Sequence, residues 1–252
     1  MKLSYRLVGF MMALVWCITA WAVPMPKDKD KEHEGQKVDA GSFGVFQNGH
    51  RVGTETFSIY QTGSGSVIDS EFKTENAPTA AVQTSEMQLT SKGEIRRYEW
   101  KEVSPGNAQS VVVPNDDFLN QKWSAGPDEK EHEQPYLLPP STSILDDYFF
   151  IHRELLAWKV LTMVCSKQAN GQLQCQPKQH TQLPTLDPHQ HSSAVLNAEF
   201  LGREKVNLKN GPQDLLKVEL KSDAGTWQLW LDDEFKVMKM LVVGENTEVV
   251  RD

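Results

Sequence analysis

The chain has 252 residues, a hydrophobic fraction of 39% and a formal net charge of −8 at pH 7. This acidic balance argues against a protein that binds nucleic acid or anionic membrane surfaces, because both functions need basic patches. The length is sufficient to bury a core as one large domain or two small ones.

The N-terminus has the features of a cleavable signal peptide. Lys2 and Arg6 precede an apolar run at residues 7–18, and Ala20-Trp21-Ala22 has the small–x–small pattern that a signal peptidase recognises. We therefore predict that residues 1–22 are removed by a cut after Ala22 and that the protein is periplasmic or secreted. The alternative is a retained membrane anchor, but the apolar run is short for a span of ~20 residues. The mature chain is expected not to span a membrane. Its charge is about −10, because the segment removes two cations and no acid.

Residues 23–39 alternate lysines with acids and contain few apolar residues. A segment of this composition cannot bury enough surface to offset the entropy of ordering, so we predict a flexible charged leader. Residues 40–252 are then expected to form a single β-rich domain.

The first half of this domain reads as an antiparallel meander. Asn48-Gly49 is a strong hairpin signal, and Phe57 and Ile59 alternate with polar neighbours in the strand that follows it. Further strands are expected at residues 67–75, 80–91, 93–103 and 109–114, the last one ending at Pro114. Residues 124–140 are predicted to be a polar, then proline-bounded, connection.

One amphipathic helix is predicted at 142–158. Ser143 is a suitable N-cap, and Asp146 and Asp147 would lie at the positive end of the helix dipole. Apolar residues recur at the spacing of one helix face, namely Ile144, Leu145, Tyr148, Phe149, Leu155 and Leu156. We expect this helix to cover a curved sheet.

The second half resembles the first in its pattern of short strands and turns. Residues 183–193 are expected to form a long loop, and strands are expected at 194–208, 213–222, 226–233, 235–244 and 247–252. In the third of these, Trp227, Leu229 and Leu231 fall on one face and Trp230 falls on the other. Both faces of 235–244 are apolar, which indicates burial on both sides.

Cys165 and Cys175 flank a three-residue loop that ends in Gly171. Counting outward from a hairpin of this kind places the two cysteines directly opposite each other, with α-carbons about 4.5 Å apart in a non-hydrogen-bonded pair. We predict a disulfide, since export would place the chain in an oxidising compartment. A free thiol pair and a metal site with nearby histidines are the alternatives.

The candidates for chemistry are sparse. His189 and His191, with His180 and Asp187, are weak candidates for a zinc or copper site, because residues two apart lie on one side of an extended strand. Ordinary surface histidines are the competing interpretation, and we predict neither a metal nor a cofactor.

Paired acids occur at Asp116-Asp117, Asp146-Asp147 and Asp232–Glu234, and each has a simpler explanation as a turn or a helix start. His152 is expected at the rim of the core. No catalytic motif is present, so we assign no catalytic residue and predict a protein that is not an enzyme.

The many aromatic residues are consistent with a cleft for an apolar ligand between sheet and helix, or with ordinary core packing. For the ligand hypothesis, the residues predicted to bind are Tyr148, Phe149 and Trp230.

The order of elements resembles that of uncharacterised bacterial secreted domain families with a half-barrel related to the lipoprotein-carrier fold. The shared pattern consists of GHRVGT at Gly49–Thr54, LWLD at Leu229–Asp232 and VMKM at Val237–Met240. The resemblance covers most of residues 40–252. It implies a curved antiparallel sheet with a helix on its concave side, and it implies no catalytic residues. The Cys165–Cys175 hairpin is not part of this pattern.

The sequence thus predicts a mainly β fold, with an antiparallel half-barrel or meander packed on one helix. The leading functional hypothesis is an exported bacterial envelope protein that binds or carries an apolar or lipid-linked ligand. The alternative is a protein–protein adaptor of an envelope complex, with a filled core and an exposed strand edge. A hydrolase is a third hypothesis. It would need carboxylates or His152 to face a shared cleft.

Overall fold

The computed structural model describes residues 35–75, 79–170, 173–177 and 179–252. The predicted signal peptide, its cut after Ala22 and most of the predicted leader lie outside the described residues. The first strand begins at Gln36, so the last four residues of the predicted leader belong to the sheet.

The described residues contain one large sheet and one small one. The strands of the large sheet are β1 (Gln36–Gln47), β2 (His50–Thr62), β3 (Gly65–Thr74), β4 (Val82–Thr90), β5 (Ile95–Ser104), β6 (Gln109–Asn115), β7 (Phe118–Ser124), β8 (His132–Tyr136), β9 (Ser143–Ile144), β12 (Gln179–Asp187), β13 (Ser192–Leu208), β14 (Gly211–Ser222), β15 (Gly225–Leu231), β16 (Val237–Val242) and β17 (Thr247–Arg251). Their order across the sheet runs from β8 down to β1, then from β17 down to β12, and ends at β9. The mainly β fold class is therefore confirmed.

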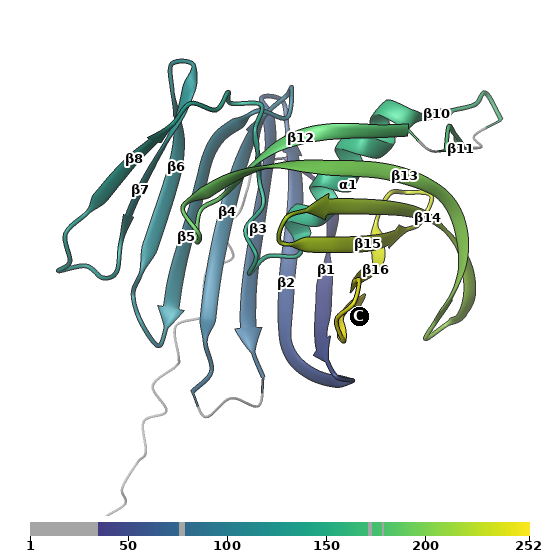
Figure 1. The fold of residues 1–252 in the computed structure, drawn as a ribbon, viewed down its shortest axis with the longest axis horizontal. Coiled ribbons are helices and arrows are strands. Elements are labelled where there is room, and N and C mark those ends of the chain that lie inside the picture. Colours follow the sequence, from purple (N-terminus) through teal and green to yellow (C-terminus); the bar gives the residue numbers. More distant parts are fainter. Residues whose placement is uncertain (1–34, 76–78, 171–172, 178) are drawn as a thin grey trace, which may run out of the picture. The chain divides into compact units, whose positions relative to one another are not determined.

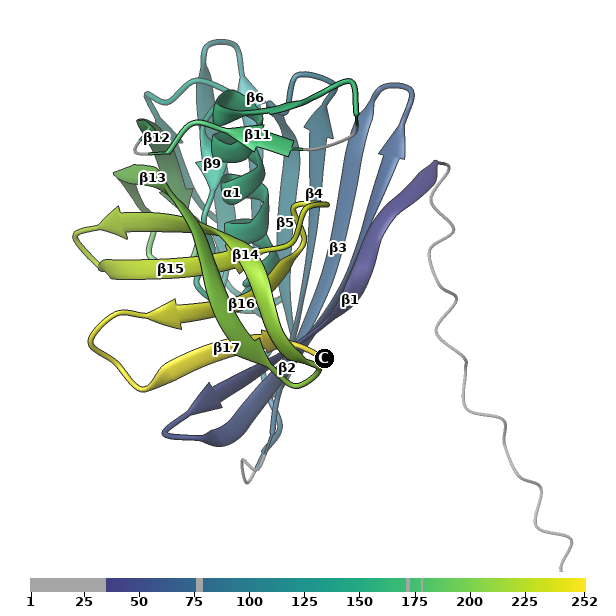
Figure 2. The ribbon, with the colours of Figure 1, turned by 90° about the vertical axis from the view of Figure 1, so that its right-hand side faces the viewer.

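Two meanders make up this sheet. The first meander is β1–β8 and the second is β12–β17, and they join because β1 pairs antiparallel with β17, with Val45 opposite Val249. In Figure 1 most strands of the first meander run nearly at right angles to β12–β15. Figure 2 shows the helix enclosed between the two meanders. The sheet is strongly curved, but its two edges, β8 and β9, do not pair with each other.

Local sequence explains the hairpins. Asn48 and Gly49 both adopt positive φ, at 52° and 78°, which is the backbone that a two-residue hairpin turn requires. Within β2 the buried side chains alternate, so Glu55, Phe57 and Ile59 all face the core. Glu55 is thus a charged residue at a core position.

The one helix among the described residues, α1, spans Ile151–Val164, which corrects the predicted range of 142–158. Ser143 is not its N-cap, because Ser143 and Ile144 form β9 and pair in parallel with Thr185 and Leu186 of β12. Asp146 instead starts a turn, in which Phe149 N donates to Asp146 O. The apolar spacing did not distinguish a helix from a strand followed by a turn, because Ile144 and Phe149 are buried in this structure as they would be in the predicted helix.

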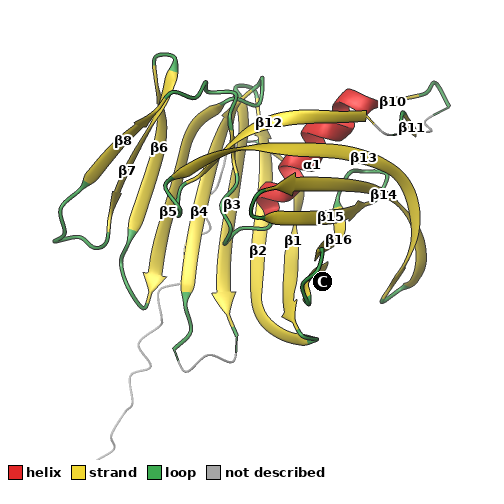
Figure 3. Ribbon diagram, in the orientation of Figure 1, coloured by secondary structure: helices red, strands yellow, loops and turns green. Residues whose placement is uncertain are grey.

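The core lies between the two meanders and surrounds the start of α1. Residues 151–154 are all buried although three of them are charged or polar, so this turn has no face exposed to solvent. The apolar core draws on both meanders, with Phe43, Ile59, Val218 and Met240 among its most buried members. Figure 3 shows the helix against the inner face of the strands. The prediction of one helix against a curved sheet is confirmed.

Three strand predictions were wrong in detail. The connection at 124–140 contains β8, the predicted loop at 183–193 contains the end of β12, and β6 continues past Pro114 to Asn115. In each case a proline was taken as a sign that no strand could form or continue there. Pro135 and Pro184 lie in strands at or near a sheet edge, where a missing N–H disrupts little.

The small sheet is a hairpin of β10 (Cys165–Lys167) and β11 (Leu173–Cys175) that follows α1. Cys165 lies opposite Cys175 as predicted, and the two form a disulfide with α-carbons 3.9 Å apart. Both side chains are half-buried against the core.

We expect the double substitution Cys165→Ser and Cys175→Ser to lower the free energy of unfolding by roughly 2–3 kcal/mol, because it frees a short loop in the unfolded chain. Urea unfolding of the purified protein measures this loss, and chemical reduction of the unsubstituted protein should reproduce it. An unchanged midpoint in both experiments would contradict the prediction.

Candidate functional site

The first turn of α1 is held by a carboxylate from the first meander. Glu55 is fully buried and accepts hydrogen bonds from Phe150 N (2.7 Å), Ile151 N (3.3 Å) and the hydroxyl of Ser70 (2.6 Å). Burial raises the pKa of Glu55 to about 7. Glu55 therefore caps the helix from a distant strand, which replaces the local cap that the sequence predicted.

The same turn is also held by the second meander. The guanidinium of Arg153 lies 4.1 Å from the ring centroid of Trp227 and pairs with Asp147 at 2.8 Å. Glu154 is fully buried and accepts from Val237 N at 3.0 Å and from Arg251 at 3.3 Å. These contacts anchor the helix, although Arg153 Nε and Nη1 and Glu154 Oε1 are buried without a hydrogen-bond partner among the described residues.

A second polar cluster lies beside the helix, around Asp146. Its carboxylate accepts from Tyr98 Oη (2.5 Å) and His189 Nδ1 (2.8 Å), and its backbone N–H donates to His152 Nδ1 (3.3 Å). Burial alone would raise the pKa of Asp146, but the hydrogen bond from His189 and the neighbouring histidine charges hold it below its ordinary value. His152 is buried and not at the core rim as predicted, and burial lowers its pKa to about 4.

The Asp146–His189 pair has the geometry of a base with its orienting carboxylate. Catalysis by such a pair needs a nucleophile on the other ring nitrogen. His189 Nε2 is buried without a hydrogen-bond partner among the described residues, so no hydroxyl or thiol of that part of the chain is in place to be activated. The cluster is arranged to hold the chain together, and it gives no support to the hydrolase hypothesis.

The turn at residues 187–191 brings the histidines against the first meander. The ring centroid of His189 lies 4.0 Å from that of Trp100, while His191 stacks on Trp123 at 4.1 Å. The two rings thus have different partners, and within the described parts of the chain no group of three or more histidine, cysteine or acidic side chains has metal-binding geometry. The turn is also fixed by Gln121, which donates to Pro188 O at 2.6 Å.

Among the described residues, the cavity found between helix and sheet, where an apolar ligand is predicted, is small. A cavity of about 20 Å³ lies there, lined by residues that include Met87, Ile95, Ile144 and Leu156. This volume holds about one water molecule, whereas small-molecule sites typically measure ~300–1,000 Å³. A lipid chain would have to displace the helix or several core side chains to enter.

The three predicted ligand residues do not come together. Phe149 is 0% exposed within the core, and Tyr148 is 41% exposed with its ring against His189. Trp230 points to the opposite face of the sheet, where it packs with Val206 and Leu215. The sequence correctly predicts that Trp230 and Leu229 lie on opposite faces of the strand. It contains no signal for the position of Tyr148 and Phe149 relative to Trp230.

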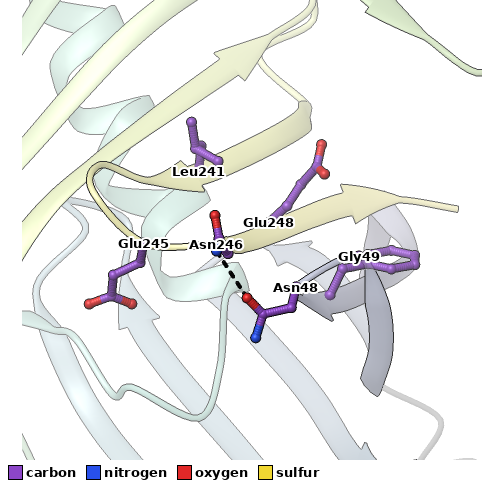
Figure 4. A pocket seen from close by; sticks show the side chains of 7 residues that line it. Asn48, Gly49, Leu241, Glu245, Asn246 and Glu248 are labelled. Atoms are coloured by element: carbon purple, nitrogen blue, oxygen red, sulfur yellow. Dashed lines mark hydrogen bonds between the residues drawn. The ribbon is translucent and has the colours of Figure 1, made fainter.

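The outer face of the sheet carries an open groove of about 430 Å³ (Figure 4). It lies where two hairpin turns meet, and Asn246 Nδ2 donates to Asn48 Oδ1 across it at 3.0 Å. Its other lining residues mix apolar and acidic side chains: Phe46, Gly49, Leu241, Glu245 and Glu248. A groove of this mixed lining does not specify one class of ligand.

The outer edge of β12 is the remaining candidate. The predicted loop at 183–193 covers only the second half of this strand, and no strand was predicted at 179–182. Leu145 N donates to Leu186 O at 3.0 Å, so the backbone groups of Leu186 point away from β13. The direction of the backbone groups alternates along a strand. The N–H and C=O groups of His180 and Gln182 and the C=O group of Pro184 therefore also point away from β13. No described residue hydrogen-bonds to these outward groups between 179 and 184. The sequence signal that could have predicted this strand is the alternation of Thr181, Leu183 and Thr185 with their neighbours.

No known family model, curated protein or solved structure matches this chain. The resemblance to carrier-type half-barrels therefore stays a prediction. Among the residues that the structure describes, no helix has the length and apolar character needed to cross a membrane.

Proposed function

We propose that this chain is a non-enzymatic interaction module of the bacterial envelope that takes up an extended polypeptide segment as an added strand on β12. The observation that carries the proposal is the row of outward backbone groups at His180 and Gln182, which have no partner among the described residues. Exposed strand edges of this kind bind extended segments through main-chain hydrogen bonds.

The contrast between edge strand β8 and the part of β12 that β9 leaves uncovered supports this proposal. β8 is only five residues long and contains Glu133 and Pro135, a charge and a missing donor that both discourage pairing. The segment from Gln179 to Leu183 has neither a proline nor a charged lysine, arginine, aspartate or glutamate. One edge is protected and the other is left open.

Export to the periplasm or beyond is part of the proposal. The Cys165–Cys175 disulfide supports it, because such bonds persist in oxidising compartments. The N-terminal sequence supports it through its basic start, apolar run and small–x–small motif.

Carriage of an apolar ligand is the second candidate, favoured by the apolar inner faces of both meanders around α1. Because the cavity there is about 20 Å³, this function needs α1 to move. Native mass spectrometry of the protein from its own envelope distinguishes the candidates. A stoichiometric lipid adduct would favour the carrier, and a bare mass would favour the interaction module.

A photo-crosslinking amino acid at His180, introduced in the native host, tests strand addition directly. We expect a discrete protein adduct that falls at least about tenfold with Gln182→Pro, because proline removes an outward donor and blocks approach. The matched control is Gln182→Thr, which keeps the N–H and should keep the adduct. An adduct of equal yield in the proline variant would show that the edge is not the binding site.

A further inference from the structure

The β12 edge is complementary to itself. Resting on the proposed function, we infer that the segment which pairs with this edge is β12 of a second copy of the chain. The pairing is antiparallel about a two-fold axis, and it makes one continuous sheet from two molecules.

A register with its two-fold axis at Thr181 satisfies both outward donors. With the axis at Thr181, His180 lies opposite the partner subunit's Gln182, and Gln182 lies opposite the partner subunit's His180. Each pair of outward residues exchanges two hydrogen bonds, so four bonds form and both outward N–H groups of each strand are used.

Neighbouring two-fold registers are less suitable. With the axis at Gln182, this residue pairs with its own copy and His180 N–H donates to the partner subunit's Pro184 O, so four hydrogen bonds also form, but the Pro184 ring then lies at the contact where an N–H would otherwise be. An axis at His180 places Gln182 opposite a residue before the start of β12 at Gln179. The axis at Thr181 is therefore favoured, because it leaves Pro184 outside the paired stretch.

Side chains also suit this register. Thr181 faces the partner subunit's Thr181 in a non-hydrogen-bonded position, where α-carbons are about 4.5 Å apart and threonine pairs are favourable. Gln179 faces the partner subunit's Leu183. No bulge interrupts β12 over this stretch, so the strand remains regular enough to pair.

Charge favours a second copy over an unrelated partner. A two-fold axis brings the same short segment of two copies together, so an edge with a net charge would repel its copy. Residues 179–186 contain no aspartate, glutamate, lysine or arginine, although the chain carries a net charge of −8. An edge without net charge suits symmetric pairing, and a heterologous partner of opposite charge would gain nothing from it.

Sedimentation equilibrium of the full chain, as its host processes it, tests the inference. We expect the weight-average mass to rise from monomer toward dimer between about 5 µM and about 1 mM, a range suited to a small interface. Gln182→Pro should raise the dissociation constant at least about tenfold, since it deletes two of the four hydrogen bonds, while Gln182→Thr leaves it within about twofold. Pro184 already occupies an outward position, so the proline variant is expected to fold, and its unfolding midpoint checks this.

Hydrogen exchange provides a readout that needs no variant. The amides of His180 and Gln182 should become protected as the concentration of the unsubstituted protein rises. A dimer that Gln182→Pro leaves intact would overturn the inference. A monomer at every concentration that still gives a heterologous adduct at His180 would overturn it and leave the proposed function standing. A monomer that gives no adduct would overturn both.

Discussion

Replacing Glu55 with alanine is expected to lower the free energy of unfolding by about 3–5 kcal/mol, one of the two largest effects we predict for a single substitution. Glu55 satisfies two backbone N–H groups of the helix start and the hydroxyl of Ser70, all of them buried. Alanine leaves these donors without a partner and removes a negative charge that interacts with buried Arg153. Urea unfolding followed by circular dichroism measures the loss.

The matched control is Glu71→Ala on the adjacent strand. Glu71 pairs with Lys73 at the surface, and exposed ion pairs contribute only ~0–1 kcal/mol. If the two variants lose similar stability, Glu55 does not cap the helix in solution.

The same residue makes stability depend on pH. Because the folded pKa of Glu55 is raised from 4.5 to about 7, the folded state binds a proton more tightly than the unfolded state. The stability from this proton is fully present below pH 4.5 and is lost as pH rises through 7. A shift of this size corresponds to roughly 3 kcal/mol. In Glu55→Gln the corresponding part of the pH dependence should disappear, which unfolding curves at pH 4.5 and pH 8 would reveal.

Arg251→Met is the second large expected effect, at about 3–5 kcal/mol. Arg251 donates to Asp39 at 2.6 Å and 3.2 Å, to Glu154 at 3.3 Å and to Val237 O at 2.9 Å. Methionine keeps much of the volume but leaves buried Glu154 without its cation and leaves Asp39 with only Lys236, at 4.0 Å. The destabilisation should be visible as a lower urea midpoint.

Arg97→Met serves as its control, because Arg97 pairs with Glu99 on the surface and its side chain is 40% exposed. Its expected loss is about 1 kcal/mol or less. Equal losses at Arg97 and Arg251 would mean that the buried ion network does not hold the first and second meanders together.

The sequence predicted what depends on short-range pattern. The hairpin at Asn48-Gly49 and the facing of Cys165 and Cys175 follow from counting residues about a turn, because strand pairing next to a turn has only one register. The face of Trp230 followed from strand alternation in the same way.

What the sequence did not predict depends on contacts between distant segments. Ser143 pairs with β12, some forty residues later in the chain. Because of this pairing the segment forms a strand, although its N-cap residue and its apolar spacing favour a helix. Glu55 is a second example. Its spacing from Phe57 and Ile59 puts all three side chains on one face of β2, but nothing in the local sequence indicated that its carboxylate would cap a helix 95 residues away.

The pairing of β1 with β17 has a consequence for how the chain folds. The first meander can form from sequential hairpins as soon as its residues are available, but its strands pair with those of the second meander only through β17, the final described strand. Arg251 of that strand also supplies the cation for Asp39 and Glu154. Contacts between residues so distant in sequence form slowly, because a long loop must close first. The inner face of the first meander is therefore not fully enclosed until β17 has formed. During that interval the chain is most exposed to aggregation and to chaperones.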